Sequence, residues 1–158
     1  MTETDLQREA QVDEILASHA GQPGALLPIL HAIQDTLGYV PPAQVGRIAQ
    51  ALNLSRADVH GVVSFYHYFR STPPGRHVVQ VCRSEACQAV QCRRTEAHAR
   101  QRLGVEFGGT TPDGTFTLEA VYCLGNCAAG PSVMIDEQLY GRVTPERFDE
   151  LVDDWRRR

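Results

Sequence analysis

The chain has 158 residues, 42% of them hydrophobic, enough for one globular domain with a smaller module attached. Its formal net charge of −4 argues against nucleic-acid binding, which depends on neutralising phosphates. No apolar run approaches the about 18 residues of a membrane span. The acidic N-terminus lacks the basic and apolar regions of a signal peptide, so we expect a cytoplasmic protein.

The first part of the chain has the apolar spacing of α-helices. Four helices are predicted, at residues 12–19, 26–37, 45–52 and from 56 onward. Gly38 stands where a glycine commonly ends a helix, and Ser55 with Asp58 resembles an imperfect capping box. We therefore expect a helical bundle.

An aromatic stretch, Phe-Tyr-His-Tyr-Phe at residues 65–69, follows the fourth predicted helix. It could form a docking surface or an electron relay. Aromatic residues at helical spacing are more often part of a core, however, and we expect these to be buried.

The segment from Arg47 to Val59 has the pattern of a helix–turn–helix DNA reader. A recognition helix offers Arg, Lys, Asn or Gln to DNA, whereas this one offers Arg56 and then Ala, Asp, Val, His, Gly and Val. Residues 1–75 hold four Arg against seven acidic residues, a net charge of −3. We interpret the pair as a packing module and keep a zinc-stabilised DNA-binding protein as the alternative from a different class.

The pattern changes at Pro73-Pro74-Gly75, which suggests a helical module over 1–72 and a second domain over 73–158. Strands are predicted at 77–81 and 115–121, a helix at 87–103, and a hairpin of 133–135 with 139–143. Thr144 and Pro145 are predicted to be the N-cap and first residue of a last helix. Helices followed by β-α-β-β-β-α indicate an α+β or α/β fold.

Four of the five cysteines form two close pairs, Cys82-x4-Cys87 and Cys123-x3-Cys127. A cytoplasmic setting keeps thiols reduced, so disulfides are not expected. Each pair begins where a predicted strand ends, and the two loops converge if the strands are neighbours. A 2Fe–2S cluster needs four thiolates, two on each iron, and one pair from each loop meets that need. We expect such a cluster here.

Other sites use similar residues. Structural zinc also takes four cysteines, although the x2 spacing that it favours is absent from both pairs. A Rieske centre needs two histidines, and neither loop contains one. A thioredoxin-type site needs Cys-x-x-Cys, which neither pair has. Ordinary buried thiols are a further interpretation of the cysteines. Cys92 is expected to be a partly buried thiol on a helix, and it is the alternative ligand if Cys87 does not bind.

The sequence His77-Val-Val-Gln-Val-Cys82-Arg-Ser-Glu-Ala-Cys87, together with Cys123-Leu-Gly-Asn-Cys127-Ala-Ala-Gly-Pro131, resembles the thioredoxin-like 2Fe–2S ferredoxins. That family includes the 24-kDa-type subunit of complex I and its relatives in NAD-reducing hydrogenases and formate dehydrogenases. Gly61-Val-Val-Ser-Phe-Tyr66 and Gly141-Arg-Val-Thr-Pro-Glu146 resemble two further motifs of the family. The residues between the cysteines, and Tyr122, look most like the gamma subunit of cytoplasmic NAD-dependent formate dehydrogenase.

The resemblance implies a helical N-terminal bundle on a thioredoxin-like domain, with Cys82, Cys87, Cys123 and Cys127 as cluster ligands. It implies a non-catalytic electron carrier that docks on an NAD-binding flavin subunit with FMN and a 4Fe–4S cluster, beside a molybdenum-containing subunit that oxidises formate. The equivalent subunit of complex I or of an NAD-reducing hydrogenase is the alternative. No residue looks like a formate, NAD or molybdopterin site, so catalysis is expected of the partners.

Overall fold

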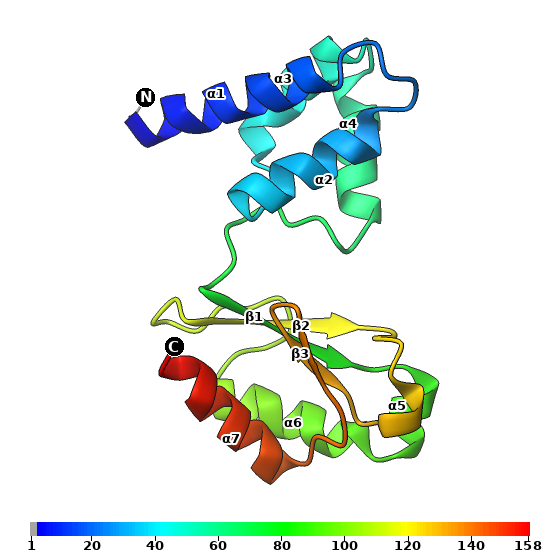
Figure 1. Cartoon of the computed structure of the whole chain (residues 1–158), viewed down its shortest axis with the longest axis vertical. Coiled ribbons are helices and arrows are strands. Elements are labelled where there is room, and N and C mark those ends of the chain that lie inside the picture. Colours follow the sequence, from blue (N-terminus) through cyan, green and yellow to red (C-terminus); the bar gives the residue numbers. More distant parts are fainter. Residues whose placement is uncertain (1–2) are drawn as a thin grey trace. The chain divides into compact units, whose positions relative to one another are not determined.

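The computed structural model describes residues 3–158 and divides into two compact units, Met1–Pro73 and Pro74–Arg158 (Figure 1). Met1 and Thr2, at the start of the acidic N-terminal segment, lie outside the described residues. Each unit has its own hydrophobic core, and among the described residues the two cores have no member in common. In the described part of the chain, no helix is long and apolar enough to cross a membrane.

The four predicted helices are present in the first unit: α1 (Glu3–Ser18), α2 (Leu26–Leu37), α3 (Val45–Ala51) and α4 (Arg56–Phe65), with a 3-10 turn η1 (Pro42–Gln44) before α3. The first of them begins at Glu3 rather than at residue 12. Gly38 ends α2 at φ 82°, a left-handed conformation that glycine adopts without strain. Ser55 and Asp58 form a complete capping box, each side chain bonding the backbone N–H of the other residue.

The helix–turn–helix-like segment packs within this unit. Ile48, Ala49 and Val59 lie in the core of the first unit. Arg47 pairs with two carboxylates of α1, at 3.1 Å from Glu9 and 2.5 Å from Asp13. The first basic residue of the segment is therefore held by acidic residues of the same unit.

The prediction that the aromatic stretch is buried was wrong for most of its members. Phe65, Tyr66 and Tyr68 are 73%, 44% and 50% exposed, and Phe69 lies in the core. Phe65, the last residue of α4, lies off the helix face that Val59, Val62 and Val63 turn to the core. The residues after Phe65 leave the helical period because α4 ends there. The rings of the stretch contact one another edge-on, and those of Tyr68 and Phe69 also lie against His31 of α2.

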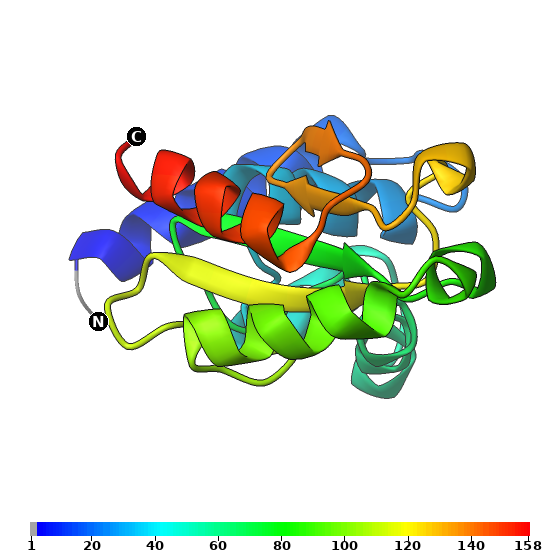
Figure 2. The ribbon, with the colours of Figure 1, turned by 90° about the horizontal axis from the view of Figure 1, so that it is seen from below.

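The second unit is built on a four-stranded sheet in the order β2-β1-β3-β4 (Figure 2). The strands are β1 (His77–Cys82), β2 (Phe116–Val121), β3 (Val133–Ile135) and β4 (Gln138–Tyr140). β1 pairs in parallel with β2 and antiparallel with β3, and β4 pairs antiparallel with β3. Parallel neighbours place the carboxyl ends of β1 and β2 at the same end of the sheet.

Two helices, α6 (Cys92–Leu103) and α7 (Pro145–Arg156), lie side by side on one face of this sheet (Figures 1 and 2). Thr144 caps α7 as predicted, because its side chain accepts the N–H of Arg147. The helices and the sheet enclose one core, made of Val79, Val81, Ala99, Leu103, Phe116, Leu118, Val133, Ile135, Val143, Phe148, Leu151, Val152 and Trp155.

Two element predictions in this unit need correction. The helix predicted over 87–103 is broken into a short α5 (Glu85–Ala89) and α6, because Gln91 adopts a left-handed φ of 65° that no helix continues through. The second hairpin strand ends at Tyr140 rather than at residue 143. Arg142 also has a positive φ, of 51°, and its N–H bonds to the carbonyl of Ala129, outside the sheet.

Candidate functional site

The two cysteine loops leave the sheet at one place. Cys82 is the last residue of β1 and lies opposite Val121, the last residue of β2, in the parallel register. Cys123 follows two residues later. The expectation that the strands are neighbours is therefore confirmed, and both loops leave the same end of the sheet (Figure 2).

The two pairs differ in exposure. Cys82 and Cys87 are buried, the second of them on α5, whereas Cys123 and Cys127 are exposed. Cys127 begins a 3-10 turn, η2 (Cys127–Ala129). One side of the site is thus covered by the chain and the other side is open to solvent.

The exposed pair has a geometry that suits one tetrahedral metal. Its Sγ atoms are 4.0 Å apart. Two thiolates bound at about 2.3 Å to one tetrahedral metal lie about 3.8 Å apart. Gly125, at φ 73°, turns the loop so that its N–H points to the Sγ of Cys123 at 3.3 Å. Bonding with Cys123 and the charge of its thiolate raise the pKa of Cys127.

Cys82 is surrounded by hydrogen-bond donors. Burial raises the pKa of its thiol, but bonds from the side chain and backbone of Ser84, from Cys87 and from the backbone of Leu124 outweigh burial and lower that pKa. The Ser84 Oγ lies 3.2 Å from the Cys82 Sγ. The chain therefore favours a thiolate at this position.

The motif Gly141-Arg-Val-Thr-Pro-Glu146, called the closing motif below, supports the loop that carries Cys127. A methyl group at Gly141 would lie 2.7 Å from the carbonyl oxygen of Ala129 and 2.8 Å from the side-chain nitrogen of Asn126. Only glycine allows this close approach, so the motif sets the position of η2. On the other side, the Cys82 N–H bonds to the carbonyl of Ser132 at 3.0 Å.

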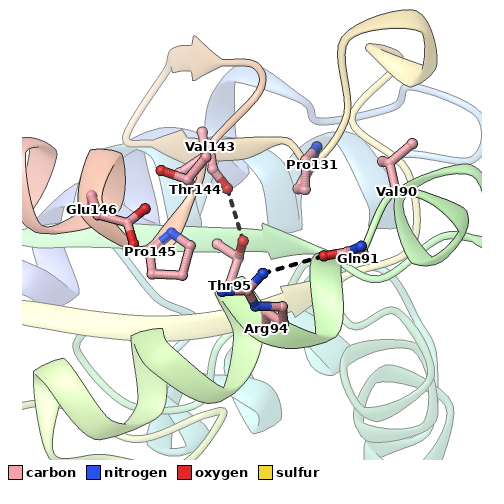
Figure 3. A pocket seen from close by; sticks show the side chains of 9 residues that line it. All are labelled: Val90, Gln91, Arg94, Thr95, Pro131, Val143, Thr144, Pro145 and Glu146. Carbon is pink, nitrogen blue, oxygen red and sulfur yellow. Dashed lines mark hydrogen bonds between the residues drawn. The ribbon is translucent and has the colours of Figure 1, made fainter.

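A cavity of about 150 Å³ lies where α6 meets the loop before α7 (Figure 3). Across it, the buried Thr95 donates to the carbonyl of Val143 at 2.8 Å. Val90 and Pro131, which come from the two cysteine loops, also line it. The cavity thus separates the cysteine loops from the start of α7, and the Thr95 bond joins α6 to the closing motif.

Cys92 is fully buried at the first turn of α6, not partly buried as predicted. Burial, followed by the charges of Cys87 and Glu96, raises the pKa of its thiol. Glu96 itself pairs with Arg83 at 3.0 Å. Arg83 is therefore held in an ion pair with a residue of α6.

Sequence reasoning named the four cysteines but missed Ser84, Leu124 and the contact of Gly141 with Ala129. Of these, the position of Ser84, at the start of a short helix two residues after a cysteine, is a recognisable signal. Within residues 3–158, the structure contains no group of three or more His, Cys, Asp or Glu side chains that could hold a metal ion. The cysteines instead stand as the two pairs described above.

Comparison with known proteins identifies relatives over almost the whole chain. The model of the family described as Thioredoxin-like [2Fe-2S] ferredoxin matches residues 12–156. The NADP-reducing hydrogenase subunit HndA of Solidesulfovibrio fructosivorans is 32% identical over 92% of this chain and 85% of its own. One of the NADH-quinone oxidoreductase subunits of Escherichia coli K12 is 35% identical over 95% of this chain and 90% of its own.

Among solved structures, the NAD+-reducing [NiFe]-hydrogenase in its H2-reduced state matches with a TM-score of 0.71 and 21% identity. The match covers 85% of this chain and 22% of the hydrogenase chain, and at this identity it supports the fold alone.

Proposed function

This chain belongs to the thioredoxin-like [2Fe-2S] ferredoxin family, whose members bind one 2Fe–2S cluster, and we propose that it carries single electrons in an NAD-linked oxidoreductase complex. The observation that carries the proposal is the pair of cysteine loops at the carboxyl ends of two neighbouring parallel strands. When bound, such a cluster accepts and donates one electron at a time.

In this proposal Cys82 and Cys87 hold one iron, and Cys123 and Cys127 hold the other. The donor set fits the group: four thiols in two pairs, with backbone N–H groups and the Ser84 hydroxyl directed at two of the sulfurs. Cluster sulfides and thiolates carry negative charge, so these donors stabilise them. The exposed Cys123 and Cys127 form the side nearest to a partner.

The partner must combine single electrons into a hydride, because NAD accepts two electrons at once. We therefore infer a flavin subunit beside this chain. Two relatives are named as subunits of a hydrogenase that reduces NADP and of an NADH–quinone oxidoreductase, which supports an NAD-linked complex of this kind. The chain itself supplies thiolates and a docking surface, and the reduction of NAD belongs to the partner.

Within that class we propose the formate dehydrogenase complex, with a molybdenum subunit and a flavin subunit as partners. The support is the Arg83-Ser84-Glu85-Ala86 sequence between the first two cysteines and Tyr122 before the third. Tyr122 is 67% exposed beside Cys123, so it is available to a partner.

Metal analysis tests the cofactor. Chain purified anaerobically should be red-brown and contain about two irons and two acid-labile sulfides. One zinc per chain without labile sulfide, from cells supplied with iron, would overturn the cluster assignment.

Activity of the isolated chain tests its role. With formate and NAD it should show no turnover, yet it should accept an electron from dithionite. Turnover by the single chain, with flavoprotein contamination excluded, would contradict the carrier role.

Purification of the complex through a tag on this chain tests the choice of partner. The complex should contain molybdenum and FMN and should reduce NAD with formate. A molybdenum-free complex that oxidises hydrogen or reduces quinone would replace formate dehydrogenase by the hydrogenase or complex I alternative, while the electron-carrier role would stand.

A further inference from the structure

Ser84 occupies a position where a serine usually caps a helix. It is the N-cap residue of α5, with extended φ and ψ of −67° and 160°. An N-cap hydroxyl normally accepts a backbone N–H of the first helical turn. Here the side chain makes no such bond, and the hydroxyl instead lies 3.2 Å from the Sγ of Cys82.

The direction of this bond follows from the charge state of Cys82. An iron ligand is a thiolate, which has no proton to give, so the hydroxyl must be the donor. Cys87, as a ligand of the same kind, cannot donate either. Neighbouring polar side chains are engaged elsewhere, since Gln88 donates to the Arg83 carbonyl and Arg83 donates to Glu96.

We propose that the Ser84 hydroxyl donates a hydrogen bond to the Cys82 thiolate and thereby raises the reduction potential of the bound cluster. This rests on the proposed function, in which Cys82 is a ligand. Reduction adds one negative charge to the cluster and its ligands, and a donor aimed at a ligand sulfur stabilises the more negative state. Removing the donor therefore makes reduction harder.

The effect is partial because two backbone donors remain. The backbone N–H groups of Ser84 and Leu124 also stabilise the Cys82 thiolate, and a change of the Ser84 side chain leaves both in place. The hydroxyl lies 3.2 Å from this sulfur, and it is the group that a side-chain substitution removes directly.

The test compares Ser84→Ala with Ser84→Thr, which keeps the hydroxyl and suits the extended backbone of an N-cap. Ser64→Ala is the matched control, because its hydroxyl bonds to carbonyls within α4 in the other unit. Iron and labile sulfide are measured first in each variant. The midpoint potential is then measured anaerobically at one pH, together with the EPR spectrum of the reduced chain.

We expect a lower midpoint potential in Ser84→Ala. At the wild-type midpoint, its reduced-to-oxidised ratio should fall on the order of threefold to tenfold. Ser84→Thr and Ser64→Ala should match the wild type. The EPR g values of Ser84→Ala should also move, whereas those of Ser84→Thr, which keeps the hydroxyl, should stay at the wild-type values.

A wild-type potential in a fully loaded Ser84→Ala chain, or an equal shift in Ser84→Thr, would overturn the inference while leaving the proposed function intact. A wild-type chain without iron and sulfide would instead overturn the proposed function. If Ser84→Ala loses its cluster, Ser84→Gly takes its place. Glycine also lacks the hydroxyl and is tolerated at N-caps. A wild-type midpoint potential in Ser84→Gly would equally overturn the inference.

Discussion

Cys82 lies directly opposite Val121 in the parallel pairing of β1 with β2. Because side chains alternate across a strand, a slip of one residue would turn Cys82 to the other face of the sheet. The register of two strands therefore determines whether the first cysteine pair can meet the second. The Cys82 N–H is held from the other side by the Ser132 carbonyl.

Substitution of the proposed ligands tests the site directly. Cys82→Ser, Cys87→Ser, Cys123→Ser and Cys127→Ser should each lose the cluster or change its spectrum, since a hydroxyl is a poorer iron ligand than a thiolate. Cys92→Ser is the control, and its reduced chain should keep the wild-type EPR spectrum. The readouts are iron and sulfide content and EPR. A Cys92→Ser chain without signal, beside a Cys87→Ser chain with a normal one, would mean that the first pair is Cys82 and Cys92.

Gly141 is predicted to be essential for the loop of Cys127. In Gly141→Ala the new methyl group meets the backbone oxygen of Ala129, and the loop must move. Such overpacking costs about 1–3 kcal/mol of unfolding free energy and should lower cluster occupancy. Gly61→Ala is the matched control. Its methyl group meets nothing within 4 Å in α4, so it should stabilise the chain by about 0.5–1 kcal/mol. Denaturant unfolding measures the stability of the two variants, and iron content measures their cluster occupancy. Equal changes in Gly141→Ala and Gly61→Ala would contradict the close approach of residue 141 to the Ala129 oxygen.

The bond from Thr95 to Val143 should contribute to the stability of the second unit. Thr95→Val keeps the shape of the side chain but leaves a buried carbonyl without its donor, at a cost of about 1–3 kcal/mol. Thr95→Ser keeps the hydroxyl and removes one methyl group, so it should cost less. Thermal unfolding followed by circular dichroism compares them. If the serine variant is the less stable one, packing rather than the hydrogen bond is the larger contribution.

The capping box of α4 should stabilise the first unit. Ser55→Ala removes the acceptor of the Asp58 N–H, and the loss of such a cap costs about 1 kcal/mol. Ser55→Thr retains the acceptor and serves as the control. Because the cap lies in the helical unit, Ser55→Ala should leave the iron content of the chain unchanged. If Ser55→Ala lost as much iron as Gly141→Ala, the capping box of the helical unit would affect the cluster site, contrary to this prediction.

Much of the fold could be predicted because its signals are local. Three signals each depend on residues close together in the sequence. They are the apolar spacing from Leu26 to Leu37, the Ser55 capping box and the Thr144-Pro145 start of α7. The cysteine loops could be located for the same reason, since each follows an apolar strand.

What could not be predicted depends on contacts that spacing does not reveal. Gln91 breaks a helix without the glycine or proline that usually marks a break, so α5 and α6 were expected to be one element. The Ser84 hydroxyl bonds to a sulfur at a position where helix capping is the ordinary use of serine. The exposure of Tyr66 and Tyr68 depends on where α4 ends, and not on the aromatic pattern.

Within the described residues, the two cores of this chain have no member in common, and the segment between Phe69 and His77 contributes to neither of them. In evolutionary terms, the helical unit and the cysteine-bearing unit can therefore be exchanged separately by recombination. A recombination event near Pro73 exchanges one unit without repacking the interior of the other.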